Sequence, residues 1–168
     1  MSELRARDRL QPALLDRLTD DHPDSQVESS DLRVISRNRL RELVLRDLAS
    51  LFNCTAPGDD IDWSRAPQAQ RSVLNFGLPA LSGRAASNID IQALQARVKQ
   101  AILDHEPRIL PATLSVEAVG NSKQLDHHNQ LGFRISGQLW AQPVPLELLL
   151  HTDIDLETGR VAVRELDI

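Results

Sequence analysis

The sequence predicts an α+β fold in which helices come first and pack on one face of an antiparallel sheet of about four strands. Two observations predict this fold. In the first two thirds of the chain, apolar residues recur at intervals of three and four, as they do on one face of a helix. After Pro111 they alternate with polar residues at every second position, as they do on a strand with one buried face.

The length and composition indicate a single domain with an aliphatic core. The chain has 168 residues, of which 41% are hydrophobic, and this supply suffices for one sizeable core but not for two. Residues 31–168 are expected to form that domain. Residues 1–30 are expected to form an N-terminal arm and linker, because Asp, Ser, Pro and Glu dominate its second half and leave almost nothing to bury.

The charge and the rare residue types exclude several classes of protein. A net charge of -5 disfavours binding to nucleic acid, and an aromatic content of 3% disfavours a stacking platform. Cys54 is the only cysteine, so no intrachain disulfide can form and a reducing cytosol fits best. The N-terminus lacks the apolar core of a signal peptide, and no stretch approaches the roughly 18 apolar residues that span a bilayer. We therefore expect a cytoplasmic protein that does not insert into a membrane.

Two helices are expected before residue 60. A short one covers about residues 12–18, with Pro12 in its first turn. A longer one starts after Ser36 as N-cap and stops at Asn53. Its apolar positions are Leu40, Leu43, Val44, Leu48 and Leu51, and its other face carries Arg37, Arg39, Arg41 and Arg46. Those arginines are expected to be solvated, to meet an acidic partner, or to meet Glu106.

A loop and a third helix follow. Residues 75–79 read as a loop in which Gly77 is free to adopt a positive φ. The next helix is expected over about residues 90–105, capped by Ser87 or Asn88.

Four strands are expected in the last third of the chain. They lie at about residues 113–118, 131–141, 146–154 and 160–166. The proline-rich residues 142–145 connect the second strand to the third, and residues 155–159 form a hairpin loop. A meander of this kind leaves two edges, and the last strand is expected to be one of them.

The most informative stretch is Glu106, Pro107 and Arg108, at the end of the third helix. A carboxylate at a helix C-terminus is unfavourable unless a cation compensates it, so Glu106 needs a positive partner. Pro107 ends the helix and turns the chain into an extended direction. Two opposite charges thus sit at a rigid corner, which suits docking to another charged surface. A plain salt bridge within the chain is the alternative.

Glu106 also suggests a peptidoglycan hydrolase that resembles lysozyme. The acid of such an enzyme must hold its proton and needs a second carboxylate about 5–9 Å away. Arg108 beside it favours the ionised carboxylate instead. The sequence also lacks a phosphate-binding glycine loop, a nucleophile elbow and a dinucleotide fingerprint. We therefore expect no enzyme, no catalytic residue and no cofactor.

Asp126, His127 and His128 raise the question of a metal site. Adjacent histidines in an extended segment point to opposite faces, and no further Cys or His lies at ligand spacing. A solvated loop tip is expected there, and no metal.

Several segments together resemble a known family. These are residues 33–36 before the arginine-rich helix, residues 72–79, the Glu106–Pro107–Arg108 turn, and residues 139–145. They resemble TssE, the small baseplate subunit of bacterial type VI secretion systems, which is similar to the wedge protein at the base of contractile phage tails. The resemblance extends from about Leu10 to Val163.

The resemblance implies a structural role with named partners. The small subunit of the wedge joins two larger ones, TssF and TssG, and the Glu-Pro-Arg turn is a contact to their helical bundle. The matching residues here are Glu106, Pro107 and Arg108. The sheet is expected to offer an edge on which the sheath subunits TssB and TssC begin to assemble, by addition of a strand. A small regulatory adaptor with this fold is a further alternative.

Overall fold

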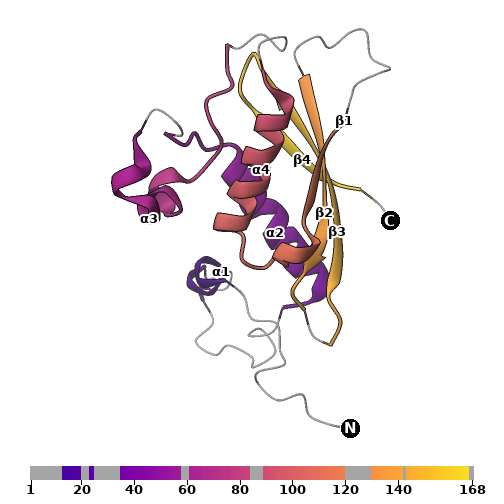
Figure 1. Cartoon of the computed structure of the whole chain (residues 1–168). Coiled ribbons are helices and arrows are strands. Elements are labelled where there is room, and N and C mark those ends of the chain that lie inside the picture. The colour runs from indigo at the N-terminus through magenta and orange to yellow at the C-terminus, as the bar shows by residue number, and fades with distance from the viewer. Residues whose placement is uncertain are drawn as a thin grey trace.

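The computed structural model describes residues 13–19, 23–24, 35–57, 61–83, 89–119, 130–141 and 143–166. Two long helices, α2 (Arg37–Phe52) and α4 (Ile91–His105), cover one face of a sheet (Figure 1). The shorter helical elements are α1 (Leu14–Leu18), η4 (Trp63–Arg65), α3 (Pro67–Gln70), η5 (Val73–Asn75) and η7 (Pro111–Thr113). All of these helical elements come before the strands in the sequence, which confirms the predicted α+β fold.

The sheet has four antiparallel strands in the order in which they occur along the chain. They are β1 (Ser115–Val119), β2 (Gln130–Leu139), β3 (Leu146–Asp155) and β4 (Val161–Glu165). Val116, Ile135 and Leu150 lie opposite one another in register and all are buried. The strands therefore turn one apolar face towards the helices, as the alternating pattern predicts.

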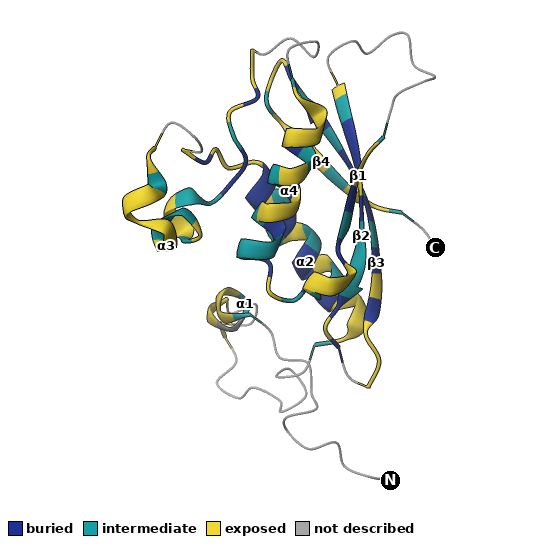
Figure 2. Ribbon diagram, in the orientation of Figure 1, coloured by how far each residue is buried: buried dark blue, intermediate teal, exposed yellow. Residues whose placement is uncertain are grey.

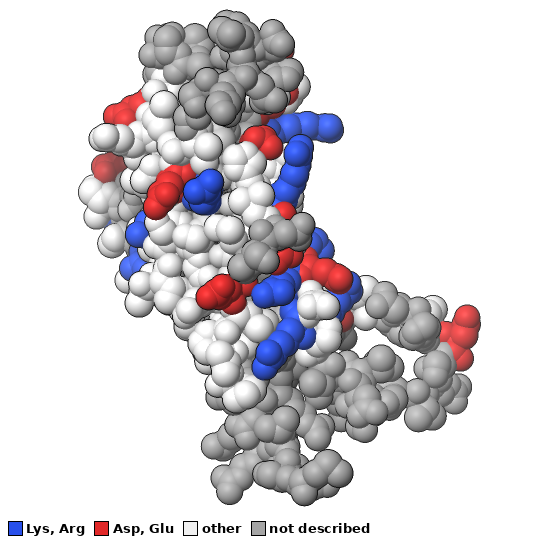
Figure 3. Space-filling view, turned by 90° about the vertical axis from the view of Figure 1, so that its right-hand side faces the viewer, with Lys and Arg blue, Asp and Glu red and all other residues white. Residues whose placement is uncertain are grey.

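The other face of the sheet carries charge of both signs. Glu117, Arg134, His151 and Arg164 occupy one row across the four strands. Figure 3 shows basic and acidic side chains intermixed on this side of the molecule. This face is therefore not a patch of a single sign, and it gives no electrostatic preference for one kind of partner.

The core lies between α2, α4 and the sheet, where the buried positions face inward (Figure 2). All five apolar positions predicted for the α2 stripe are buried. From α4 the core receives Leu94, Val98 and Ile102, and from the sheet it receives Phe133, Ile135 and Leu150. The helices are held in place by this shared burial far more than by their intrinsic propensities.

The N-cap predicted for α2 is found in the structure, whereas the N-cap predicted for α4 is not. The Ser36 side chain accepts a hydrogen bond from the Arg39 amide at 3.1 Å, so the predicted cap of α2 is confirmed. The prediction of Ser87 or Asn88 as the cap of α4 was wrong, because Asp90 accepts from the amides of Gln92 and Ala93 at 2.9 and 3.0 Å. Aspartate caps as well as serine or asparagine does, and Asp90 directly precedes the helix.

Candidate functional site: the charged corner after helix α4

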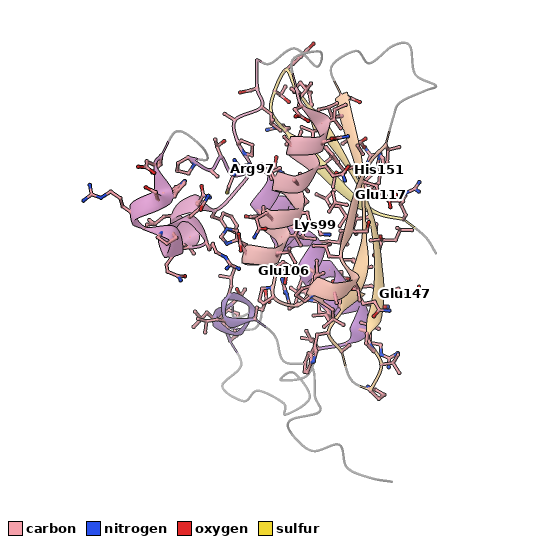
Figure 4. The ribbon with its side chains drawn as sticks, in the orientation of Figure 1. Arg97, Lys99, Glu106, Glu117, Glu147 and His151 are labelled. Atoms are coloured by element: carbon pink, nitrogen blue, oxygen red, sulfur yellow. The ribbon has the colours of Figure 1, made fainter. Side chains whose placement is uncertain are left out.

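The Glu106–Pro107–Arg108 turn is held between helix and sheet by its backbone. Glu106 is the C-cap of α4, and its amide donates to the Ile102 carbonyl at 2.8 Å. The Trp140 amide donates to the Arg108 carbonyl at 2.7 Å. The next residues form a short bridge with the end of β2, so the chain leaves the helix and immediately joins the sheet. The predicted rigid corner is therefore present, and Figure 4 shows Glu106 directly below the last turn of α4.

Glu106 finds its cation within the same chain. Its side chain is only 3% exposed. Both carboxylate oxygens bond the Arg108 guanidinium, with Nε to Oε1 at 2.7 Å and Nη2 to Oε2 at 2.5 Å. The Arg108 amide donates to Oε1 as well, at 3.1 Å. This two-point pairing is the strongest geometry for arginine and carboxylate, and it satisfies the positive partner that the helix C-terminus requires.

A second carboxylate, which the sequence did not single out, reaches the same guanidinium. Asp47 of α2 accepts from Arg108 Nη2 at 2.6 Å. Burial alone would lower the pKa of Arg108, but hydrogen bonds and the charges of Glu106 and Asp47 outweigh it and hold that pKa above its usual value. Among the described residues no α2 arginine pairs with Glu106, so that alternative for the arginines is not found. Helix α2 instead contributes an acid, Asp47, to Arg108.

The pairing continues from the corner to the N-terminal helix. Arg46 bonds Asp47 at 2.7 Å and Asp16 of α1 at 2.6 Å. The hydrogen bonds to Asp16 and then Asp47 raise the pKa of Arg46. Asp16, Arg46, Asp47, Arg108 and Glu106 therefore form one chain of alternating charges, which we call the corner network. It joins three segments that are far apart in the sequence.

The three residues of the turn differ in how far they are exposed to solvent. Pro107 is exposed, Arg108 is partly exposed with 22% of its side chain accessible, and Glu106 is buried. A partner that reaches this turn therefore meets Pro107 and the rim of Arg108, while Glu106 fixes the guanidinium from behind.

The surroundings of Glu106 do not favour proton-transfer chemistry. Both of its carboxylate oxygens already accept hydrogen bonds from the Arg108 guanidinium, and its side chain is only 3% exposed. A surface pocket of about 1070 Å³ lies at the C-terminal end of α2, lined by Asn53, Cys54, Asp153 and Arg160 among others, and Glu106 does not line it. No observation on the described residues supports the hydrolase alternative.

The edge of the sheet at β4 is the second candidate site. Asn53, just after α2, accepts from the Val161 amide at 3.0 Å and donates to the Val161 carbonyl at 2.9 Å. Backbone groups of alternate residues point away from β3, so those of Val163 and Glu165 also face outward. Among the described residues, neither has a hydrogen-bond partner on that side. The opposite edge is less open, because Gln95 of α4 accepts from the Ala118 amide at 3.2 Å.

Other expectations from the sequence concern metals and membranes. Asp126, His127 and His128 lie outside the described residues. Within the described ranges, no group of three or more His, Cys, Asp or Glu side chains is placed to hold a metal ion. In the same part of the chain, no helix combines the length and the apolar character needed to cross a bilayer.

Comparison with known proteins identifies the family. Residues 38–144 match the family described as baseplate wedge protein gp25, a range that contains α2 except for Arg37, all of α4, the corner, β1 and β2. Neither a curated protein nor a solved structure gave a match. TssE subunits are members of the same family, so the resemblance found in the sequence is confirmed at the level of the family. The chain belongs to the baseplate wedge protein gp25 family.

Proposed function

We propose that this chain is the small structural subunit of a type VI secretion baseplate, of the TssE type. It docks into the wedge subunits TssF and TssG through the Glu106–Pro107–Arg108 turn, on the cytoplasmic side of the inner membrane. Membership of a baseplate wedge family supports the structural role. The single observation that supports the docking site is the geometry of the corner, which a buried two-point ion pair and a backbone bridge to the sheet hold in place.

The members of the turn have different roles in this proposal. Glu106 is a positioning residue, because its side chain is enclosed. Pro107 and the exposed part of Arg108 form the contact. Rigid presentation favours binding, since little conformational entropy is lost when the partner arrives.

Pro107→Asp tests the docking role without disturbing the ion pair. Pro107 is exposed, so we expect the stability of the isolated protein to change little. The added charge and the lost apolar surface should weaken binding to a purified TssF–TssG complex at least tenfold in calorimetry. Pro57→Asp is the matched control, because Pro57 is also exposed but lies beyond the C-terminal end of α2, outside the turn. Equal affinities of the two variants would contradict docking at the turn.

The sheet edge carries the second part of the proposal, which is the start of sheath assembly. The outward backbone groups of Val163 and Glu165 can pair with an incoming strand from TssB or TssC. The Asn53 side chain already bonds the outward amide and carbonyl of Val161. The incoming strand must therefore begin its pairing beyond that residue.

Val163→Pro tests the edge directly. Proline removes the outward amide of Val163 but is tolerated in an edge strand, so the fold should persist. We expect growth of TssB–TssC sheath from reconstituted wedges, counted by electron microscopy, to fall at least fivefold, while wedge assembly stays normal. Ala118→Pro is the control on the opposite edge, where the amide already bonds Gln95. Normal sheath growth with Val163→Pro would show that β4 is not the starting edge.

A further inference from the structure

We propose that Asn53 is a positioning residue that sets the register of a partner strand on β4, and that this strand carries an apolar side chain opposite Val163. The inference rests on the proposed start of sheath assembly at this edge and specifies the strand that the edge accepts. We call the side of β4 that faces away from β3, together with Asn53, the β4 edge.

The Asn53 carboxamide imitates a residue of a neighbouring strand. Its Oδ1 accepts from the Val161 amide at 3.0 Å and its Nδ2 donates to the Val161 carbonyl at 2.9 Å, which are the two bonds that a paired residue of a further strand would make. Nδ2 also donates to the Ala49 carbonyl at 2.8 Å, so the carboxamide is oriented by three complementary partners. The first pairing position of the β4 edge is therefore taken by the chain itself.

The remaining pairing positions select an extended strand as the occupant. The Leu166 amide donates to the Leu149 carbonyl of β3, so the odd-numbered residues of β4 direct their backbone groups away from β3. Among the described residues, Val163 and Glu165 have no hydrogen-bond partner on that side. Their amides and carbonyls match the backbone of another strand, whereas a helix uses its own backbone groups internally.

The surface beside Val161 has room for a strand, so the limit at this position is chemical. The pocket at the C-terminal end of α2 is lined by Asn53, Val161, Ala162 and Arg164 among others. Strands change register in steps of two residues, because a shift of one turns every side chain to the other face. Without the Asn53 side chain, a partner strand could therefore pair one step further, with Val161.

Helix α2 provides the surface on which the inward side chain of the partner strand would lie. The helix is attached to both ends of β4, through Arg41 at one end and Asn53 at the other. Leu45 and Ala49 lie between these two residues on the same row of the helix, and both are half-buried. Directly opposite residues of paired strands share a face, and Val163 faces the helices. The partner residue opposite Val163 would thus pack beside Leu45, which favours an apolar side chain.

Disulfide mapping on reconstituted wedges with TssB–TssC sheath tests the register. A photo-crosslinking amino acid at Arg164 first identifies the partner strand. Single cysteines along that strand are then combined with Arg164→Cys or Ala162→Cys, each with Cys54→Ser to remove the native thiol. Both positions are exposed and face away from the helices. A residue paired at position 164 would have its Cα about 4.5 Å away, which suits a disulfide.

The expected result is one linked position for Arg164→Cys, at about tenfold the yield of any link to Ala162→Cys. When Asn53→Ala is added, Ala162→Cys should link within about twofold of Arg164→Cys, because pairing then extends to Val161. Gln95→Ala is the matched control, since it removes the carboxamide bond to Ala118 on the opposite edge and should leave the pattern unchanged.

Two outcomes would overturn the role of Asn53. One is an equal yield from the two cysteines while Asn53 is present, a comparison that does not depend on the stability of Asn53→Ala. The other is an unchanged pattern in a folded Asn53→Ala protein. The partner residue opposite Val163 should be Val, Ile or Leu, and a charged residue there would contradict the apolar part of the inference.

The two proposals fail in different ways. If the sheath assembles and neither cysteine links to TssB or TssC, sheath assembly does not start at β4, and this inference fails with that proposal. If Arg164→Cys links and Asn53→Ala does not extend the pairing, only the role of Asn53 is contradicted.

Discussion

Arg108→Met is expected to lower the free energy of unfolding by about 3–5 kcal/mol, because it leaves a buried carboxylate without its cation. Glu106 is 3% exposed, and the Arg108 guanidinium donates a hydrogen bond to each of its two carboxylate oxygens. Methionine fills a similar volume, so lost packing contributes little to the expected change. The measurement is urea denaturation followed by circular dichroism.

The matching double variant separates the charge from the packing. Glu106→Gln with Arg108→Met removes the buried charge together with its partner, and it should recover at least half of the stability lost in Arg108→Met. Arg108→Lys should fall between wild type and Arg108→Met, since an ammonium group keeps the charge but cannot bond both oxygens in one plane. If Arg108→Met costs less than about 1 kcal/mol, the ion pair does not organise the corner.

Gly77→Ala is the second change with a large expected effect, a loss of about 3 kcal/mol or more in the free energy of unfolding. Gly77 has a φ of +122°, and a Cβ atom there would lie 2.3 Å from the Cys54 carbonyl oxygen. The neighbouring Leu78 amide donates to that same carbonyl at 3.0 Å, so the loop cannot move away without losing this bond. Thermal or urea unfolding of the variant measures the loss.

Gly83→Ala provides the control for the backbone conformation alone. Gly83 also has a positive φ, +76°, but no atom lies within 4 Å of the place of its Cβ. This variant should lose only about 1 kcal/mol, the cost of the left-handed backbone for a residue with a side chain. Equal losses at the two positions would show that the close contact with Cys54 does not matter.

Most of the fold could be predicted because its elements have strong local patterns. The α2 stripe and the alternation in β2 each repeat over ten or more residues, and both are found where expected. Gly77 adopts a positive φ, which its expected place in the loop over residues 75–79 allowed. The cap of α4 was assigned wrongly because Ser, Asn and Asp residues follow one another there, and capping preference alone does not choose among them.

The candidate site could be predicted only in part, for a different reason. Glu106 and Arg108 are two residues apart, and helix termination at Pro107 predicts the corner that holds them. Their pairing with each other is the salt bridge that the sequence offered only as the alternative to docking. Asp47 is separated from Arg108 by 61 positions, and Asp16 from Arg46 by 30, so no local pattern reports these contacts. The only hint in the sequence at Asp47 is that an acid borders the apolar stripe of an arginine-rich helix. That Asp47 bonds Arg108 can be known only once α2 is seen to pack beside the end of α4.

The Asn53 side chain has a mechanical consequence for the last strand. Its Oδ1 accepts a hydrogen bond from the Val161 amide, and its Nδ2 donates to the Val161 carbonyl. Nδ2 also donates to the Ala49 carbonyl at 2.8 Å. At the far end of β4, Arg41 of the same helix lies 3.6 Å from Glu165 and donates to the Glu147 carbonyl of β3. Tension on β4 is therefore passed at both ends into α2, whose leucines are anchored in the core. We therefore expect separation of β4 from the sheet to require breaking these contacts with α2 as well as the pairing with β3.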